Sequence, residues 1–393
     1  MRRITANYIF PVVSQPLPKG LIEIGDNGEI ISVIPNGQYL MNDSIETYNG
    51  IIVPGFVNTH CHLELSHLKG KLRENNGIIH FLSDVRSQRQ VSRELIDKAM
   101  LDADTNMKNE GIVAVGDISN TDHSFVVKKK SSIIYHTFIE VYGVDKSLAS
   151  DRLNHANHLK AKAQSLGLPA SVTVHAPYSL SKELKQSFFE NIQNDDILSI
   201  HHQESKDEIE MIEQKSGELL NLMVNMGLDK AEWLNDTVNL MDSLFGQAQS
   251  TKNILLVHNT FTNIEVIKKL VSTKHKVTWV LCPNSNMYIQ NTLPNVNVFI
   301  ENNCSVALGT DSYASNTSLS VLEEIKTLHQ HFPQISLTDL ISWATLNGAR
   351  ALNIDTLLGS FEVGKKPGVN LIKDIDLNSL QITNDCKVEP IFP

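Results

Sequence analysis

Eight short apolar runs, rich in β-branched residues, alternate with helical patterns through most of the chain. Continuous apolar strands separated by helices are typical of a parallel sheet whose outer faces are covered by helices. Eight such runs suit an eight-stranded α/β barrel, the (β/α)8 or TIM-like fold, although a doubly wound sheet stays open on this count alone. The runs are Ile52–Thr59, Ile112–Ser119, Ser132–Tyr142, Ser171–Ala176, Ile197–His202, Ile254–Asn259, Val277–Cys282 and Val306–Thr310.

The segments between these runs carry the helical patterns, and they contain no G-x-G-x-x-G or G-x-x-x-x-G-K-[ST] motif, so a nucleotide-phosphate loop is not indicated. The stretch Lys206–Lys252 has no readable motif, and we expect it to shape a substrate pocket. The expected helices are Ser92–Asn109, Arg152–Leu166, Lys182–Gln193, Asp207–Asn225, Ile264–Ser272 and Ser318–Gln330.

The two ends of the chain differ from its middle. Residues 1–55 hold short alternating runs around Asp26-Asn27-Gly28, which is a hairpin signal, and residues 357–393 hold short apolar pieces separated by glycine and proline. Both are too β-rich for barrel helices. We therefore predict that the ends pair into one small β-sandwich domain beside a catalytic barrel formed by residues 56–356.

The composition of the chain limits which binding partners and which cellular location we expect for this protein. The 393-residue chain has 34 basic and 44 acidic residues, a net charge of −10 and no long basic block, so nucleic acid is not an expected partner. No apolar run approaches the roughly 18 residues of a membrane span, and the N-terminus does not resemble a signal peptide. Four cysteines without paired spacing predict no disulfide framework. These features predict a cytoplasmic protein that acts on a small molecule.

Polar residues with catalytic or metal-binding chemistry lie at or just after the end of five of the eight runs. In an α/β barrel the chemistry lies at the carboxyl ends of the strands, so residues from these ends meet on one rim. One histidine on a strand is more often structural, but five coincidences on one rim indicate a site. The residues are His60 and His62 after the first run, His175 at the end of the fourth, His201 and His202 at the end of the fifth with Glu204 after it, His258 at the end of the sixth and Asp311 after the eighth.

Part of this set suits a single divalent ion. His60 and His62 are two apart, so on an extended strand both imidazoles point to the same side. Together with one histidine of the fifth run and Asp311, they offer three imidazoles and a carboxylate, which suits Zn²⁺ or Fe²⁺. No lysine ends the fourth run, where a modified lysine would bridge two metals, so one metal is favoured.

The chain resembles the amidohydrolase superfamily, in its branch of mononuclear deaminases and chlorohydrolase-like enzymes. The resemblance implies that His60, His62, His201 and Asp311 bind the metal, that Glu204 is a proton shuttle and His258 a catalytic histidine, and that His175 contacts substrate. A homodimer is a further expectation at the level of the family. The matching elements are VPGFVNTHCH, HAPYSLS, HHQES, VHNT, LCPNSN, GTDS, ATLNGARAL and LGSFEVGKKPG, which occur in the family's order.

His201 and His202 need separate treatment, because one step along a strand reverses the face on which a side chain lies. The family's spacing of His, two residues and Glu selects His201 with Glu204, so we expect His202 to be a packed or hydrogen-bonded residue. Structural alternatives also exist for the other residues. Glu204 is adjacent to a helix start, Asp311 suits a turn, and His258 and His175 suit a core.

The stretch His62–Ser66, His-Leu-Glu-Leu-Ser, resembles the aminodeoxyfutalosine deaminases of menaquinone synthesis. Glu64 and Ser66 share the strand parity of the ligands, so they meet substrate if the chain stays extended. A carboxylate on the substrate needs an arginine, and Arg86 is a candidate beside Arg73 and Arg89. Enzymes acting on adenosine, 5′-methylthioadenosine and S-adenosylhomocysteine share the catalytic residues and stay open.

We therefore expect hydrolytic deamination of an adenine nucleoside with release of ammonia. Glu204 moves protons to the ring and the leaving amine, Asp311 accepts the proton of water, and His258 stabilises the attacking oxygen. A related hydrolase acting on a cyclic amide, a guanine- or cytosine-type base or a chlorinated ring needs the same metal. A catalytically inactive scaffold is the non-enzymatic alternative, but such a protein is expected to lack ligands, and none is missing here.

Overall fold

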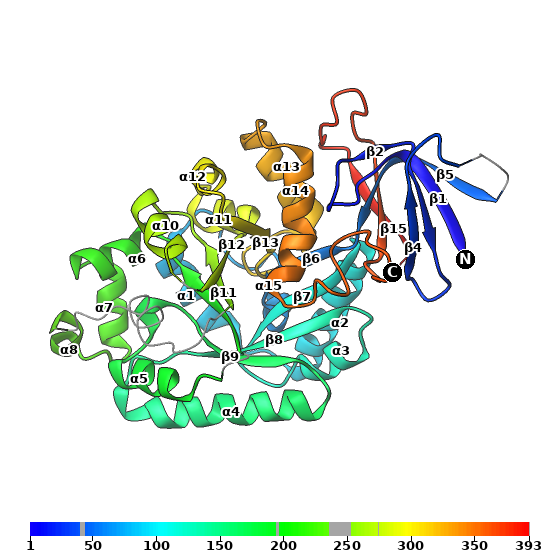
Figure 1. Ribbon diagram of the computed structural model, residues 1–393. Helices are drawn as coiled ribbons and strands as arrows, with labels where there is room; N and C mark the ends of the chain where they lie inside the picture. Colours follow the sequence, from blue (N-terminus) through cyan, green and yellow to red (C-terminus); the bar gives the residue numbers. More distant parts are fainter. Residues whose placement is uncertain (40–43, 194–195, 236–252, 274, 393) are drawn as a thin grey trace.

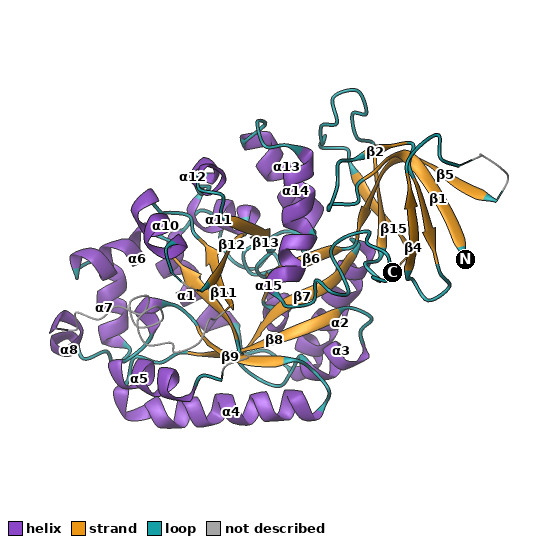
Figure 2. Cartoon of the chain, viewed as in Figure 1, coloured by secondary structure: helices purple, strands orange, loops and turns teal. Residues whose placement is uncertain are grey.

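The computed structural model describes residues 1–39, 44–193, 196–235, 253–273 and 275–392. Strands lie inside the larger part of the molecule and helices surround them, while both chain ends lie in a separate sheet at one side (Figures 1 and 2). Most of the predicted segment Lys206–Lys252 is described, but its residues 236–252 lie outside the described part. The predicted alternation of strands and helices is confirmed, and the chain is an α/β protein with parallel sheets.

Eight parallel strands correspond to the eight predicted runs. They form two four-stranded sheets, in the orders β6-β7-β8-β9 and β10-β11-β12-β13. The sheets adjoin at one edge through a bond from His201 N to His175 O of 2.8 Å, and at the other through a parallel bridge between Cys61 and Asp311. The strands are β6 (Phe56–Cys61), β7 (Ile112–Ser119), β8 (Ile134–Val141), β9 (Ala170–Val174), β10 (Ile197–His202), β11 (Asn253–His258), β12 (Lys276–Leu281) and β13 (Ser305–Leu308).

The helices cover these strands with one apolar face each. In α2 (Arg93–Asn109) the buried residues Ile96, Met100, Ala103 and Met107 recur at intervals of three and four, as one helical face requires. Burying each large side chain contributes roughly 1.5–3 kcal/mol. The other α-helices are α1 (Gly77–Gln88), α3 (Phe125–Lys130), α4 (Ala149–Ser165), α5 (Lys182–Asn191), α6 (Lys206–Ile209), α7 (Glu218–Asn225), α8 (Lys230–Asn235), α10 (Ile264–Val271), α11 (Pro283–Gln290), α12 (Val296–Glu301), α13 (Val321–His331), α14 (Leu337–Ala344) and α15 (Leu346–Ala351).

The predicted single helix Asp207–Asn225 is wrong, because the segment breaks into α6, the π-helical turn η4 (Glu210–Gln214) and α7. Lys215 ends the turn with a left-handed backbone at φ 54°, and Gly217 follows at φ 98°, which favours glycine. The helical spacing of apolar residues continues across this interruption, so the sequence pattern did not predict the break. The other short turns are η1 (Leu63–Leu68), η2 (Lys146–Leu148) and η3 (Pro177–Ser179).

The two chain ends meet in one seven-stranded mixed sheet. Its order is β15-β14-β5-β1-β3-β4, with β2 paired to β1. The pairing of the ends and the predicted hairpin, which joins β3 and β4, are confirmed. A β-sandwich is not confirmed, because these described strands form a single hydrogen-bonded sheet. The strands are β1 (Arg2–Ile9), β2 (Leu17–Pro18), β3 (Leu21–Ile24), β4 (Ile30–Ile34), β5 (Ile45–Pro54), β14 (Val369–Lys373) and β15 (Lys387–Phe392).

Gly55 separates the two sheets. The first predicted run, Ile52–Thr59, is wrong as one strand, because its first part belongs to β5 in the terminal sheet and its second to β6. A Cβ on Gly55 would lie 2.3 Å from Val113 Cγ1 and 2.6 Å from Pro367 O, so only glycine fits without a shift. This close approach holds the terminal sheet against the start of β6 and β7.

Among the described residues, no helix combines the length and the apolar character needed to cross a membrane.

Candidate metal and catalytic site

The predicted ligands converge from the carboxyl ends of three strands. His60 is the second-last residue of β6, His62 directly follows that strand, and His201 lies near the end of β10. Asp311 follows β13 by three residues, and its backbone nitrogen donates to His60 O at 3.0 Å. That bond joins the loop after the last parallel strand to the end of the first, so two residues from distant parts of the chain share one site.

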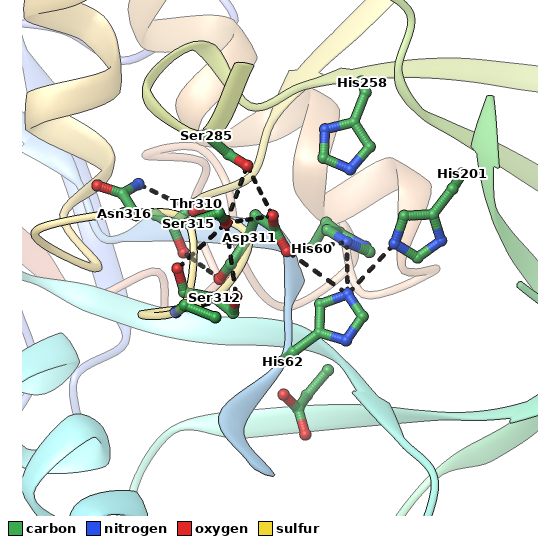
Figure 3. Close-up of polar contacts among 12 residues, drawn as sticks. His60, His62, His201, His258, Ser285, Thr310, Asp311, Ser312, Ser315 and Asn316 are labelled. Carbon is green, nitrogen blue, oxygen red and sulfur yellow. Dashed lines mark hydrogen bonds and ion pairs between the residues drawn. The ribbon is translucent and has the colours of Figure 1, made fainter. Parts of the chain in front are cut away.

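Four ligand atoms face one another at short range (Figure 3). His62 Nε2 lies 3.1 Å from His60 Nε2 and 3.3 Å from His201 Nε2. Asp311 Oδ1 lies 3.5 Å from His62 Nε2 and 3.8 Å from His60 Nε2. Three imidazole nitrogens and one carboxylate oxygen therefore point at the same small region.

Burial keeps these imidazoles neutral. It lowers the pKa of His60 well below its ordinary value, that of His62 to about 3 and that of His201 to about 4. His201 Nδ1 lies 3.1 Å from the carbonyl oxygen of His175, which only accepts, so Nδ1 carries the hydrogen. The lone pair of His201 is then on Nε2 and faces His62, which is the tautomer that a metal ligand requires.

Asp311 is held in place by two hydroxyl groups. Ser285 Oγ and Ser315 Oγ both donate to its Oδ2, at 2.7 and 2.5 Å, which leaves Oδ1 facing the histidines. Burial alone would raise the pKa of Asp311, but His62, His258 and the two serine hydroxyls outweigh it, and the pKa is lowered. Asp311 also adopts a left-handed backbone with φ 55°, which aspartate tolerates better than most residues.

These residues fit a divalent cation. His60, His62 and Asp311 offer ligand atoms within 4.8 Å of one another, and so do His60, His201 and His258. Neutral imidazoles and one carboxylate, all largely buried, are the donor set that zinc or iron prefers. Without a cation, the converging lone pairs of such a cluster repel one another.

Glu204 and His258 adjoin this cluster, and His258 groups with His60 and His201. His258 is the last residue of β11, with φ 75°, and its Nε2 lies 3.7 Å from Glu204 Oε1. Burial, then the charges of Asp311 and Glu208, raises the pKa of Glu204 well above its ordinary value, while burial lowers that of His258 to about 3. Burial therefore favours the protonated form of Glu204, which lies beside a neutral imidazole, and both side chains are buried.

His175 and His202 lie as the sequence indicated. His175 follows β9, contacts Ser179 Oγ through Nδ1 at 3.1 Å, and lines the cavity described below. His202 Nδ1 instead meets Asn259 Oδ1 at 3.0 Å, and its ring packs against Trp279 away from the ligands. The alternation of strand faces thus separates the two neighbouring histidines of β10.

A cavity of about 500 Å³ opens onto the cluster. Arg86, Arg89 and Arg152 lie in its wall, and the histidines, Glu204 and Asp311 form its polar end. Arg86 thus lies where a substrate contact was predicted. Much of the remaining wall is apolar and includes part of α7, so the predicted segment Lys206–Lys252 does contribute to the pocket; the apolar residues are Leu65, Ile78, Phe81, Leu82, Val85, Val144, Leu222, Met223 and Met226.

Glu64 and Ser66 are not placed as expected. The chain does not stay extended after His62 but turns into η1, so the strand parity on which their prediction rested is lost. Glu64 accepts hydrogen bonds from Thr121 Oγ1 at 2.7 Å and from the backbone of Asn120 at 3.1 Å, and Ser66 Oγ donates to Leu63 O. Neither residue lines the cavity. Substrate contact by these two residues is therefore not supported by the geometry.

Glu140 is a site residue that sequence reasoning missed. It lies near the end of β8, lines the cavity, and groups with His175 and His201 within 4.8 Å. The signal was present, because a glutamate inside the run ending Phe-Ile-Glu-Val-Tyr is unusual in an otherwise apolar strand. It was missed because it lies two residues before the end of its predicted run, Ser132–Tyr142, whereas the other candidates lie within one residue of the end of a run or beyond it.

A buried ion pair supports the strand that carries the histidines. Lys128 Nζ lies 2.6 Å from Asp117 Oδ2, and both side chains are fully buried. The other oxygen of Asp117 accepts the backbone N–H of Leu63 at 2.7 Å, immediately after His62. The pair therefore fixes the point at which the chain leaves β6 and turns into η1.

Comparison with known proteins agrees with this geometry. The model of the amidohydrolase family matches residues 51–391. The chain is 26% identical to an adenosine deaminase of Helicobacter pylori, over 89% of this chain and 84% of that protein. It is 28% identical to an aminodeoxyfutalosine deaminase of a Nitratiruptor species, over 82% and 79%. The crystal structure of Helicobacter pylori aminofutalosine deaminase with methylthio-coformycin has the same fold, with a TM-score of 0.77, 23% identity and coverage of 98% and 94%.

Proposed function

The chain belongs to the amidohydrolase family, and from this premise we propose that it deaminates an adenine nucleoside by hydrolysis. It is a hydrolase that acts on carbon–nitrogen bonds of cyclic amidines. The observation that carries the proposal is the convergence of three neutral imidazoles and a carboxylate beside Glu204, whose pKa is raised by burial, at one end of the cavity. Both relatives compared above are deaminases of adenine nucleosides by name.

His60, His62, His201 and Asp311 would hold one divalent metal, and zinc is the ion we propose, with iron as the alternative. When bound, such an ion supplies a Lewis acid that lowers the pKa of water toward neutrality. The ligand assignment rests on the convergence of the four donor atoms and on the tautomer of His201. The hydroxyls of Ser285 and Ser315 would keep Asp311 oriented toward it.

Glu204 is the proton carrier in this proposal. Deamination adds the oxygen of water to C6 of adenine, places a proton on N1 and expels the amino group as ammonia. Because the pKa of Glu204 is raised, its carboxyl group holds a proton that it can donate to N1 when water adds. The carboxylate left behind takes a proton from the added water and delivers it to the leaving nitrogen.

In this proposal, Asp311 and His258 act on the water molecule that attacks C6. Asp311 is ionised, since its pKa is lowered, and it accepts a proton as the oxygen of water adds to C6. After ammonia leaves, that proton passes to Glu204, which restores both carboxyl groups to their starting state. The neutral His258 has no hydrogen-bond partner on Nε2 among the described residues, and this nitrogen faces Glu204. It can therefore bind the added oxygen and orient it toward the carbon. His175, in the adjoining wall, would contact the purine.

Within adenine nucleosides, we propose a substrate that carries an extended group on its 5′ carbon, with aminodeoxyfutalosine of menaquinone synthesis as the first candidate. The cavity of about 500 Å³ has room for more than an adenine ring, and its wall combines apolar side chains with the three arginines Arg86, Arg89 and Arg152. Guanidinium groups suit a carboxylate. Adenosine, 5′-methylthioadenosine and S-adenosylhomocysteine are the competing substrates.

The second candidate function is hydrolysis of a guanine- or cytosine-type base, a cyclic amide or a chlorinated ring by the same metal site. A panel assay on the zinc-loaded protein distinguishes the candidates by product. We expect ammonia from an adenine nucleoside, with the highest kcat/KM for aminodeoxyfutalosine. Chloride from a chlorinated ring, or ring opening of a cyclic amide without any ammonia from nucleosides, would contradict the proposal.

We further propose that the eight parallel strands close into a barrel spanning residues 56–356, beside a terminal domain of residues 1–55 and 357–393. The two contacts that join the four-stranded sheets at both edges support closure. A homodimer and a cytoplasmic location remain predictions; the four cysteines are all free, which suits a reducing compartment.

A further inference from the structure

Glu204 reaches the cavity although simple strand geometry would turn it away. Side chains alternate between the two faces of a strand, so an extended chain after β10 would place Glu204 on the face of His202, away from the ligands. Glu204 instead lies in the cavity wall together with His201. The change of direction occurs at Gln203, whose backbone is left-handed with φ 48°. The position of the proposed proton carrier therefore depends on this one turn.

Two neighbouring segments hold the turn at Gln203, whose left-handed backbone is unfavourable for glutamine. On one side, Glu208 Oε1 accepts the backbone N–H of Gln203 at 3.0 Å, and Glu208 Oε2 accepts that of Glu204 at 2.9 Å. On the other side, Phe261 N, from the loop after β11, donates to Gln203 O at 3.0 Å. The peptide groups before and after Gln203 are thus both fixed.

The contacts of Glu208 differ from those of ordinary helix capping. Glu208 is the third residue of α6, and its backbone nitrogen donates to Oγ of the N-cap residue Ser205 at 3.0 Å. In a capping box, the side chain of the third helical residue returns to the N–H of the N-cap itself. Here the two oxygens bind the two residues that precede the N-cap. Capping of α6 therefore does not account for the position of this carboxyl group.

Glu208 itself lies behind the site. Its side chain is fully buried and does not line the cavity, so it does not touch a substrate there and acts through the backbone that it holds. Resting on the proposed function, we propose that Glu208 is a positioning residue: it maintains the left-handed turn at Gln203 and so directs the carboxyl group of Glu204 into the cavity.

The Glu208→Gln variant tests this role. The amide of glutamine offers one acceptor oxygen and one donor nitrogen, so it can accept only one of the two backbone N–H groups. We expect kcat of the zinc-loaded protein for adenosine and aminodeoxyfutalosine to fall about 10- to 100-fold, because a small misplacement of a catalytic group is this costly. KM should change little, since the cavity wall is otherwise intact. A higher KM with an unchanged kcat, or no change in either, would overturn the role.

Glu64→Gln is the matched control, because Glu64 makes the same kind of contact after another strand. It is a buried glutamate whose two oxygens accept the backbone N–H groups of Asn120 and Thr121, the two residues that follow β7. No proton transfer is assigned to that loop, so Glu64→Gln should keep kcat near that of the unchanged enzyme. An equal fall of kcat in both variants would indicate a general loss of stability and overturn the role of Glu208.

Substitutions of Gln203 test the turn without changing Glu208, so they apply even if Glu208→Gln does not fold. Asparagine tolerates a left-handed backbone, whereas a β-branched residue such as valine does not. Gln203→Val should therefore lower kcat as Glu208→Gln does, while Gln203→Asn should retain more of it. Equal kcat in the two Gln203 variants would contradict a role for the turn.

Crystal structures of zinc-loaded Glu208→Gln and Gln203→Val separate this inference from the proposed function, because they require no reaction. We expect the carboxyl group of Glu204 to be displaced from His258 in both variants. An unmoved Glu204 would overturn the positioning role and leave the deaminase function standing. Displacement of Glu204, with no ammonia released from any nucleoside by the unchanged enzyme, would uphold the positioning role and overturn deamination.

Discussion

At the scale of single residues, two adjacent histidines have opposite surroundings. His201 directs Nε2 at His62, whereas His202 directs Nδ1 at Asn259 and packs on Trp279. Both are buried, and burial lowers the pKa of each to about 4, so both are neutral at pH 7. Position relative to the sheet, not protonation, decides which of them can bind a metal.

Substitution of these two histidines should therefore separate metal binding from packing. We expect His201→Asn to weaken metal binding more than about 100-fold, since changes even to residues behind a ligand cost 10- to 100-fold. His202→Asn should retain one metal per chain while lowering the melting temperature. Metal content by mass spectrometry after dialysis measures this, and loss of metal in His202→Asn alone would reverse the assignment.

His136 provides a test of pH dependence away from the metal site. Burial, then the charges of Lys128 and Lys160, lowers its pKa from the ordinary 6.5 to about 4, and its Nε2 meets Ser171 Oγ at 2.9 Å. Below pH 6.5, His136 therefore binds a proton in the unfolded chain but stays neutral in the folded chain until the pH approaches 4. The stability that His136 contributes is complete above pH 6.5 and is lost as the pH falls toward 4.

A His136→Gln variant does not titrate, so the stability difference between it and the natural protein should change across this window. We expect the natural protein to lose up to about 1.4 kcal/mol per pH unit relative to the variant between pH 6.5 and 4. Urea titrations at several pH values measure the difference. A constant difference would show that His136 has the same pKa in both states.

Residue patterns predicted which side chains converge at the cluster, but they did not predict the positions of Glu64 and Ser66. The convergence of His60, His62, His201 and Asp311 was predictable because each lies at or just after the end of an apolar run, and strand ends meet on one rim. Glu64 and Ser66 were misplaced because strand parity ends where η1 begins. No local sequence pattern predicts that turn, because it depends on a hydrogen bond from Leu63 N to Asp117 on the neighbouring strand β7.

At the scale of elements, Gly55 divides the apolar run Ile52–Thr59, whose sequence predicts a single strand. The division was not predictable, because it depends on Val113 and Pro367, which approach from distant parts of the chain. Gly55→Ala should destabilise the protein by about 1–3 kcal/mol, since backbone cannot shift as easily as a side chain. Gly70→Ala is the control.

In Gly70→Ala the new Cβ meets open space, and only the left-handed backbone, φ 66°, adds strain of about 1–2 kcal/mol. Thermal unfolding compares the two. A Gly55→Ala protein as stable as the natural one would show that the junction between β5 and β6 is loose.

The Lys128–Asp117 pair connects α3 to β7 and, through Leu63 N, to the end of β6. Lys128→Met should cost about 3–5 kcal/mol, because it leaves a buried carboxylate without its cation. The double variant Lys128→Met with Asp117→Asn should recover part of that loss. Chemical denaturation measures both, and equal stability of the single and double variants would argue against a buried charge.

At the scale of the whole molecule, the terminal sheet and the eight-stranded part meet at the β5–β6 junction and at β14, where Asn370 Nδ2 donates to Gly111 O at 2.8 Å. The pairing of the two chain ends was predictable from their shared β-rich, turn-rich composition. The sandwich was not found, because composition does not specify whether seven strands form one sheet or two. The alternation of strands and helices was predictable because continuous apolar strands occur where helices cover a parallel sheet.

The central claim is that one metal site and Glu204 together hydrolyse the amino group of an adenine nucleoside. The most direct measurement is ammonia release from adenosine and aminodeoxyfutalosine by zinc-loaded protein, metal-stripped protein and zinc-loaded Glu204→Gln. We predict turnover by the zinc-loaded protein, none after metal removal with recovery on readdition, and a loss of about 10²- to 10⁴-fold in Glu204→Gln. Ammonia release that survives in Glu204→Gln, or none from a protein holding one metal per chain, would contradict it.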